Sequence, residues 1–182
     1  MGNFRQSRFI HESRKSGVIS ILFPSDSSKG VILYLHGNTG ALDKWGNISK
    51  TYTILHYDLF MMDYRGYGKS EGSIKNEDEL YSDVQEVYNY LKSFYNENKI
   101  IVLGYSIGTG PAAFLASKNH PKELILQAPY YSLPDAMHHL RPSYDTTKIA
   151  FHFEPISSLN TQQSRSLFSM ETKIKCFTMV LR

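Results

Sequence analysis

The sequence predicts an α/β protein with a mostly parallel central sheet flanked by helices, and three observations support this fold class. Residues 31–35, 59–62 and 100–103 are nearly continuous apolar runs, which is typical of strands buried on both faces. Segments with apolar residues at helical spacing separate these runs. A glycine-rich turn follows each run. Strands and helices that alternate in this way form parallel sheets with right-handed crossovers.

The longest predicted helix runs from Glu77 to about Tyr95. Asn76 before it, with Glu79 three residues later, is typical of an N-cap with a returning carboxylate. The apolar positions recur at steps of three and four and therefore share one face. They are Leu80, Val84, Val87, Leu91 and Phe94.

Shorter elements complete the predicted order, and residues 1–182 are treated as a single domain because no repeat or low-complexity linker interrupts them. Residues 130–172 lack a clean period and predict no element. The expected shorter elements are a strand over 18–23, a short helix through Trp45, a helix over 111–117 and strands over 123–127 and 174–181.

Composition limits the classes of function. Hydrophobic residues make up 41% of the chain and charged residues 20%, which is ordinary for a globular protein. A net charge of +3, evenly spread, does not favour binding to nucleic acid. The single cysteine, Cys176, excludes an internal disulfide, and no apolar run approaches the ~20 residues of a membrane span. We therefore expect a cytoplasmic protein without a membrane span.

Residues 104–108 read Gly-Tyr-Ser-Ile-Gly and match the pattern G-x-S-x-G. They lie between a predicted strand and a predicted helix, which is the context of a nucleophile elbow. Gly104 and Gly108 fit the close passage of strand and helix there, where side chains would collide. Ser106 is therefore the candidate nucleophile. The alternative is a turn whose glycines serve packing only.

An acyl-transfer site also needs two amide donors aimed at the developing oxyanion. One is expected from Ile107, directly after the nucleophile, and the other from the loop after the strand at 31–35. Asn38 is the first candidate for the second donor, and Thr39 is the alternative. His36, in the same loop, is expected to brace the turn rather than to act as the base.

Three motifs in this order resemble the α/β-hydrolase superfamily: His-Gly-Asn at 36–38, Asp-Tyr-Arg-Gly-Tyr-Gly-Lys-Ser-Glu-Gly at 63–72, and the elbow at 104–108. The resemblance covers residues 18 to about 135. It is strongest to the serine-aminopeptidase-like branch, which includes esterases and acyl-protein thioesterases. It implies an α/β-hydrolase fold, Ser106 as the nucleophile, and an oxyanion hole from the amides of Asn38 and Ile107.

The implied activity is hydrolysis of a small-molecule carboxylic ester or acyl thioester through an acyl-enzyme. No cofactor is expected. His138-His139 is not expected to bind metal, since no cysteine or carboxylate stands at structural-zinc spacing. Asp63 and Arg65 are expected to hold their own loop together rather than to contact substrate.

Relatives in this superfamily carry the triad acid after the seventh strand and the histidine after the eighth. Here the chain ends at Arg182, after the strand expected at 174–181. The resemblance therefore implies a fold that lacks its last strand and helix, and a hydrolase impaired by the missing acid and histidine. A substitute acid is Asp135, with His138, His139 or His152 as substitute bases.

Two further expectations follow. The alternative to an impaired or fragmentary hydrolase is a non-catalytic α/β-hydrolase-like protein that binds a small acyl ligand or a protein partner. The strand at 174–181 carries apolar side chains on both faces, which is typical of a strand with two neighbours. We expect self-association through this strand, because exposed apolar edges recruit other chains.

Overall fold

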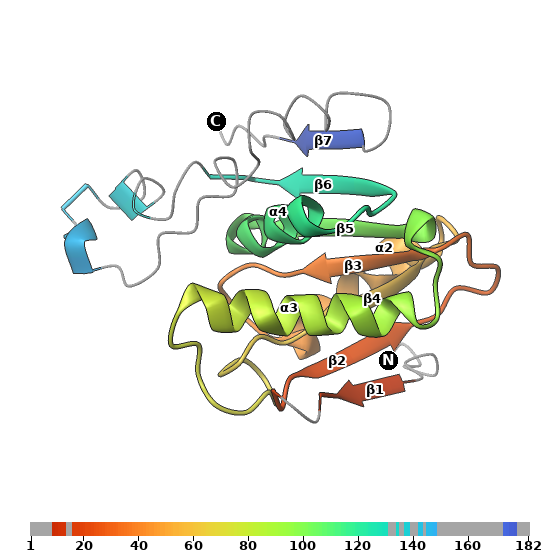
Figure 1. Cartoon of the computed structure of the whole chain (residues 1–182), viewed down its shortest axis with the longest axis horizontal. Coiled ribbons are helices and arrows are strands. Elements are labelled where there is room, and N and C mark those ends of the chain that lie inside the picture. Colours follow the sequence, from red (N-terminus) through yellow and green to blue (C-terminus); the bar gives the residue numbers. More distant parts are fainter. Residues whose placement is uncertain are drawn as a thin grey trace.

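The computed structural model describes residues 9–13, 16–130, 134, 137–138, 142–143, 145–148 and 173–177. Seven strands form one sheet in the order β1-β2-β4-β3-β5-β6-β7 (Figure 1). The strands are β1 (Phe9–Glu12), β2 (Ile19–Phe23), β3 (Val31–Leu35), β4 (Asp58–Met62), β5 (Ile100–Tyr105), β6 (Glu123–Gln127) and β7 (Lys173–Phe177).

The sheet is mostly parallel, as the sequence predicted. Only the two pairings of β2, with β1 and with β4, are antiparallel. All pairings from β4 to β7 are parallel, so the carboxyl ends of β3, β5 and β6 meet at the same edge of the sheet. Loops that leave these strands are therefore neighbours, although they are far apart in sequence.

Helices lie on both faces of the sheet (Figure 1). The helices are α1 (Leu42–Trp45), α2 (Ser49–Thr53), α3 (Glu77–Lys92) and α4 (Thr109–Lys118). The core divides between the faces: Leu33 packs with α3 and α4, whereas its neighbours Ile32 and Tyr34 pack with α1 and α2. Because successive residues of a strand face opposite sides, burial on both faces produces the continuous apolar runs of the sequence.

The start of α3 is capped as predicted, with one correction. Asn76 Oδ1 accepts a hydrogen bond from Glu79 N at 2.9 Å. The Glu79 carboxylate, however, accepts from Lys75 N rather than from the cap residue. Asn76→Ala is therefore expected to lower the free energy of unfolding by about 1 kcal/mol, measured by urea denaturation. An unchanged denaturation midpoint would contradict the capping role.

The end of α3 differs from the prediction. The helix stops at Lys92, and Phe94, assigned from its spacing to the buried face, is 66% exposed. Phe94 N bonds to Leu91 O, three residues back, so the helical phase that would bury position 94 is lost. Tyr88, which the pattern did not include, is fully buried instead.

The sequence pattern did not predict the strand β1 or the helix α2. The β1 segment contains the polar residues His11 and Glu12, and it is a strand because it pairs with β2. His11 also stacks on Tyr90 of α3, with ring centroids 3.7 Å apart. The α2 segment is short and contains β-branched residues, and it continues the turn begun by α1. Tertiary contacts decide both elements.

The last strand is confirmed in place but not in extent. β7 pairs with β6 in parallel, with Cys176 opposite Leu126. Residues 178–181, which the prediction included in this strand, lie outside the described residues. Within the described residues, no helix is both long and apolar enough to cross a bilayer.

Candidate active site

Ser106 lies at a sharp turn between β5 and α4. A single 3-10 turn, Ser106–Gly108, joins the two elements, which confirms the predicted strand–turn–helix context. Ser106 has φ = +51°, a left-handed conformation that costs a non-glycine residue about 1–3 kcal/mol. Thr109 Oγ1 donates to Ser106 O at 2.7 Å and helps to hold the turn. The half-buried serine is thus held in a strained elbow at the end of a central strand.

The two glycines of the motif are required for close packing, as predicted. A Cβ at position 104 would lie 2.7 Å from the Cα of Thr109. A Cβ at position 108 would overlap the carbonyl oxygen of Leu35, the last residue of β3. The elbow therefore packs directly against the point where the loop 36–40 begins.

The loop 36–40 is held by aromatic side chains from two neighbouring segments. Tyr67 donates its hydroxyl to Asn38 Oδ1 at 2.6 Å. Trp45 Nε1 donates to Thr39 O at 2.9 Å. Asn38 and Thr39 are themselves exposed. No motif in the sequence marks either aromatic residue as a loop contact, because only the fold reveals which loop they contact.

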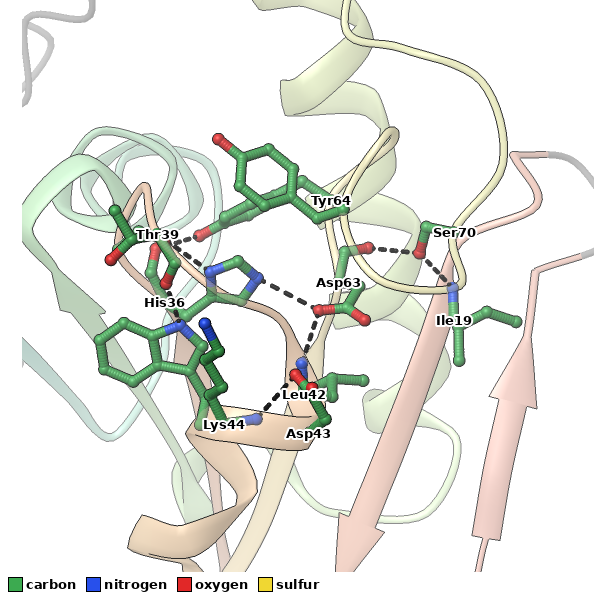
Figure 2. Close-up of polar contacts among 12 residues, drawn as sticks. Ile19, His36, Thr39, Leu42, Asp43, Lys44, Asp63, Tyr64 and Ser70 are labelled. Atoms are coloured by element: carbon green, nitrogen blue, oxygen red, sulfur yellow. Dashed lines mark hydrogen bonds and ion pairs between the residues drawn. The ribbon is translucent and has the colours of Figure 1, made fainter.

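His36 is buried beneath this loop and braces it, as expected (Figure 2). Its Nδ1 donates to Gly37 O at 2.7 Å, and its Nε2 lies 3.5 Å from Asp63 Oδ1. Tyr64 donates its hydroxyl to His36 O at 2.9 Å. Burial and the nearby Tyr130 raise the pKa of Tyr64 well above its ordinary value, so the hydroxyl stays protonated as a donor.

Ile107, the candidate oxyanion donor that follows the nucleophile, is held by an aromatic side chain of its own. Tyr130 donates its hydroxyl to Ile107 O at 3.2 Å. Burial, together with Tyr81 and Glu77, raises the pKa of Tyr130 and keeps this donor protonated. Ile107 and the loop 36–40 follow adjacent parallel strands and lie at the same edge of the sheet.

Asp63 and Arg65 hold their loop together, as the sequence predicted. Asp63 Oδ1 accepts from Leu42 N at 2.9 Å, which ties the loop to α1. Arg65 forms two hydrogen bonds with Asp83 of α3, at 2.6 and 2.8 Å. Asp83 is 2% exposed and its partner 25% exposed, so the pair joins the loop to the buried side of α3.

The candidate acid and bases are only partly described. Asp135, His139 and His152 lie outside the described residues. His138 is helical and exposed. Among the described residues, no group of three or more His, Cys, Asp or Glu side chains could hold a metal ion.

The fold and the elbow agree with the comparison to known families. A family model described as the alpha/beta hydrolase fold matches residues 30–151. The chain belongs to the α/β-hydrolase family. The match begins just before β3 and contains the loop 36–40, the loop after β4 and the elbow at Ser106.

Several relatives resemble this α/β-hydrolase in sequence. It is 32% identical over 133 residues to the uncharacterized protein R595 of Acanthamoeba polyphaga mimivirus, with 64% of this chain and 43% of that protein covered. It is 36% identical over 114 residues to the lysophosphatidylserine lipase ABHD12 of Danio rerio, with 59% and 30% covered. The chain spans less than half the length of the curated relatives it matches.

Solved structures support the same fold. An α/β hydrolase from Vibrio vulnificus superposes with a TM-score of 0.70 at 18% identity, covering 96% of this chain and 74% of that one. A monoglyceride lipase from Saccharomyces cerevisiae superposes with a TM-score of 0.61 at 18% identity, covering 76% and 50%. At this identity the likeness shows the α/β-hydrolase fold alone.

Proposed function

We propose that this α/β-hydrolase is a serine hydrolase that acts on a carboxylic ester or acyl thioester through an acyl-enzyme on Ser106. The observation that carries the proposal is the strained elbow. Strain at a non-glycine residue persists where the surrounding structure holds it, and at Ser106 it coincides with the strand–turn–helix context of a nucleophile elbow. The similarity to a lysophosphatidylserine lipase supports an ester as the substrate.

In the proposed reaction, Ser106 Oγ attacks the carbonyl carbon while a base takes its proton. The amides of Ile107 and Asn38, with Thr39 as the alternative to Asn38, donate to the oxyanion that forms. The bond to the leaving alcohol or thiol breaks, the leaving group departs with a proton, and the acyl group stays on Oγ. Water then attacks the acyl-enzyme, which releases the acid and restores the serine.

The proposal includes a slow first step. A serine hydroxyl is a weak nucleophile until a base removes its proton. Asp135 and His138 are the substitute acid and base that we propose to test. Without a base, the oxyanion donors and substrate binding supply the remaining acceleration.

A fluorophosphonate probe tests the nucleophile directly. We expect one covalent adduct on the wild-type chain after prolonged incubation, detected by intact mass and located on Ser106. Ser106→Ala should lose the adduct. Ser117→Ala is the matched control, because Ser117 lies in α4, the helix that follows the elbow, and its hydroxyl donates to Phe114 O within that helix. An adduct that survives Ser106→Ala would contradict the assignment.

Turnover of a p-nitrophenyl acyl ester tests the slow first step. We expect weak hydrolysis, on the order of 10³–10⁴ over the uncatalysed rate, which is what a serine hydrolase retains without its triad. Robust turnover that Ser106→Ala abolishes would contradict the impairment and reveal an active base. Asp135→Ala and His138→Ala would then identify it through a loss of kcat.

A second candidate function is non-catalytic binding of an acyl ligand or protein partner. The same probe separates the two: a wild-type chain that forms no adduct at any incubation time favours the binding protein and overturns the hydrolase.

We also propose self-association through β7. Among the described strands, β7 pairs with β6 alone. In the sequence over 174–181, both sets of alternate residues include apolar side chains. Size exclusion with light scattering is expected to show a dimer or larger species at micromolar concentration. Val180→Lys should shift it toward monomer, because a charged side chain within this apolar sequence opposes pairing between chains. A wild-type monomer at all concentrations would contradict the proposal.

A further inference from the structure

Three large apolar side chains are exposed at the amino end of the sheet, where β3, β4 and β5 begin. Ile54 is 76% exposed, Leu55 57% and Phe94 66%, and no other large apolar side chain within the described segments is exposed. Ile54 and Leu55 lie between α2 and β4, and Phe94 lies between α3 and β5 (Figure 1). Since β4 and β5 both run parallel to β3, these segments lie at the end of the sheet opposite Ser106.

Hydrogen bonds hold the two apolar segments beside each other. Tyr95, the residue after Phe94, donates its hydroxyl to Asp58 Oδ2 at 2.8 Å. Asp58 begins β4, three residues after Leu55, and its Oδ1 accepts from Ser25 N at 2.7 Å. The exposed apolar side chains therefore belong to one surface, although they come from opposite faces of the sheet.

Three exposed lysines lie against the same segments. Lys29 N donates to His56 O at 2.8 Å, and Lys122 Nζ donates to the Tyr57 hydroxyl at 2.9 Å. Lys99 is adjacent to Lys29 in space, because a Cβ on Gly30 would meet the backbone and Cβ of Lys99.

The acidic side chains of the loops that enter these strands balance the lysines only in part. Asp58 is buried, and both of its oxygens accept hydrogen bonds. Glu97 is half-buried and faces Lys92, with Oε1 and Nζ 3.7 Å apart. Asp26 is exposed. The surface is thus apolar and basic.

We propose that this surface binds an anionic lipid bilayer, and we call it the amino-end surface. Its apolar side chains enter the boundary between headgroups and acyl chains, which removes exposed apolar area from water. Its lysines lie near the anionic headgroups, where each basic side chain strengthens binding. The residues that form the surface are Lys29, Ile54, Leu55, Phe94, Lys99 and Lys122.

Area and charge favour a bilayer over a protein partner. A stable protein–protein interface buries roughly 800 Å² on each side around a packed apolar centre. Three apolar side chains on two separate turns do not supply such a centre. A bilayer requires no matching shape, and its affinity grows with each side chain that inserts and each lysine near the headgroups. In this orientation the elbow at Ser106 faces away from the lipid.

Flotation of the full chain with lipid vesicles tests the surface. We expect the chain to float with phosphatidylcholine vesicles that contain about 30% phosphatidylserine, at about 0.1 M salt. Binding to pure phosphatidylcholine vesicles should be at least 10-fold weaker. Aggregated protein does not float, so this assay separates lipid binding from self-association.

Two paired variants and one matched control locate the binding. Ile54→Asn with Leu55→Asn should weaken binding at least 10-fold through lost insertion. Lys29→Gln with Lys99→Gln should weaken it at least 10-fold, at about 5-fold per lysine. Lys44→Gln with Lys75→Gln removes the same charge from exposed positions at the other end of the sheet and should bind like the wild type. All these side chains are exposed, so an unchanged Tm is expected and confirms that each variant folds.

Tryptophan fluorescence tests the orientation on the bilayer. Trp45 is the only tryptophan, and it lies in α1, at the end of the sheet that carries the elbow. Lipids brominated in their acyl chains should therefore leave the fluorescence of the bound wild type unchanged. In Trp45→Phe with Phe94→Trp, the same lipids should quench the introduced indole, because it inserts.

Three results would overturn the proposal: no flotation with the anionic vesicles, equal binding to neutral vesicles, or equal losses in the control pair and the surface variants. A dimer that Ile54→Asn with Leu55→Asn dissociates, but Val180→Lys does not, would make this surface a protein interface and would also overturn it. None of these measurements depends on Ser106 as a nucleophile. Failure of the bilayer surface and failure of the proposed hydrolase are therefore distinguishable.

Discussion

Gly108→Ala is expected to lower the free energy of unfolding by about 3 kcal/mol or more, beyond the usual cost of an overpacked side chain. Gly108 has ordinary backbone dihedrals, with φ of −66°, so the cost arises from space alone. The new methyl would overlap the carbonyl oxygen of Leu35 and would also meet His36 O. Backbone atoms at the end of a central strand cannot move aside as a flexible side chain can.

Gly72→Ala is the matched control for this prediction. Gly72 has φ = +72° but nothing within 4 Å of the added Cβ, so only its backbone conformation resists alanine. We expect a loss of about 1 kcal/mol there. Urea denaturation followed by circular dichroism gives both values. If the two variants lose equal stability, the close contact between elbow and β3 is not what requires glycine at 108.

Arg65→Ala is expected to lower the free energy of unfolding by about 3 kcal/mol, since it leaves the buried Asp83 without its partner. Asp83 is 2% exposed, and both of its carboxylate oxygens accept from the guanidinium. A single buried charge without a counter-ion is far more costly than the pair. The loss also frees the loop after β4 from α3.

Lys92→Ala is the matched control for the ion pair. Lys92 Nζ lies 3.7 Å from Glu97 Oε1, and both side chains are more exposed than Asp83. Its loss should cost under about 1 kcal/mol. Arg65→Met combined with Asp83→Leu should recover most of the stability lost by Arg65→Ala, because it removes the unpaired charge. A double variant as unstable as the single one would contradict this account.

The order of strands and helices was predictable because buried positions are apolar and recur in the sequence at the spacing of each element. Residues 31–35 are apolar throughout because β3 is buried on both faces, and its predicted bounds match the structure. The elbow was predictable for a similar local reason. Gly104 and Gly108 flank Ser106 where a strand meets a helix. Each glycine is needed because a side chain there would collide with backbone atoms of the turn or of the adjacent strand.

The predictions that were wrong or missing, at the end of α3 and at β1, depend on contacts between residues that are distant in sequence. Helical spacing continues to Phe94, but the chain turns after Lys92 and leaves that ring 66% exposed. The β1 segment carries no strong strand pattern and is ordered by pairing with β2. Neither outcome has a signal within a short window of residues.

The sequence by itself determined the fold class, the elbow and the candidate nucleophile, because each depends on residues that are close together in the chain. Tertiary structure alone decided which side chains support them. Tyr67 contacts Asn38, and Arg65 contacts Asp83, only because parallel strands bring the ends of β3 and β4 together and place α3 beside them. The same assembly forms an apolar cavity beside β2, lined by residues that include Ile21, Leu42 and Asp63. Hydrogen bonds and cavities of this kind depend on distances between elements, which local periodicity does not encode.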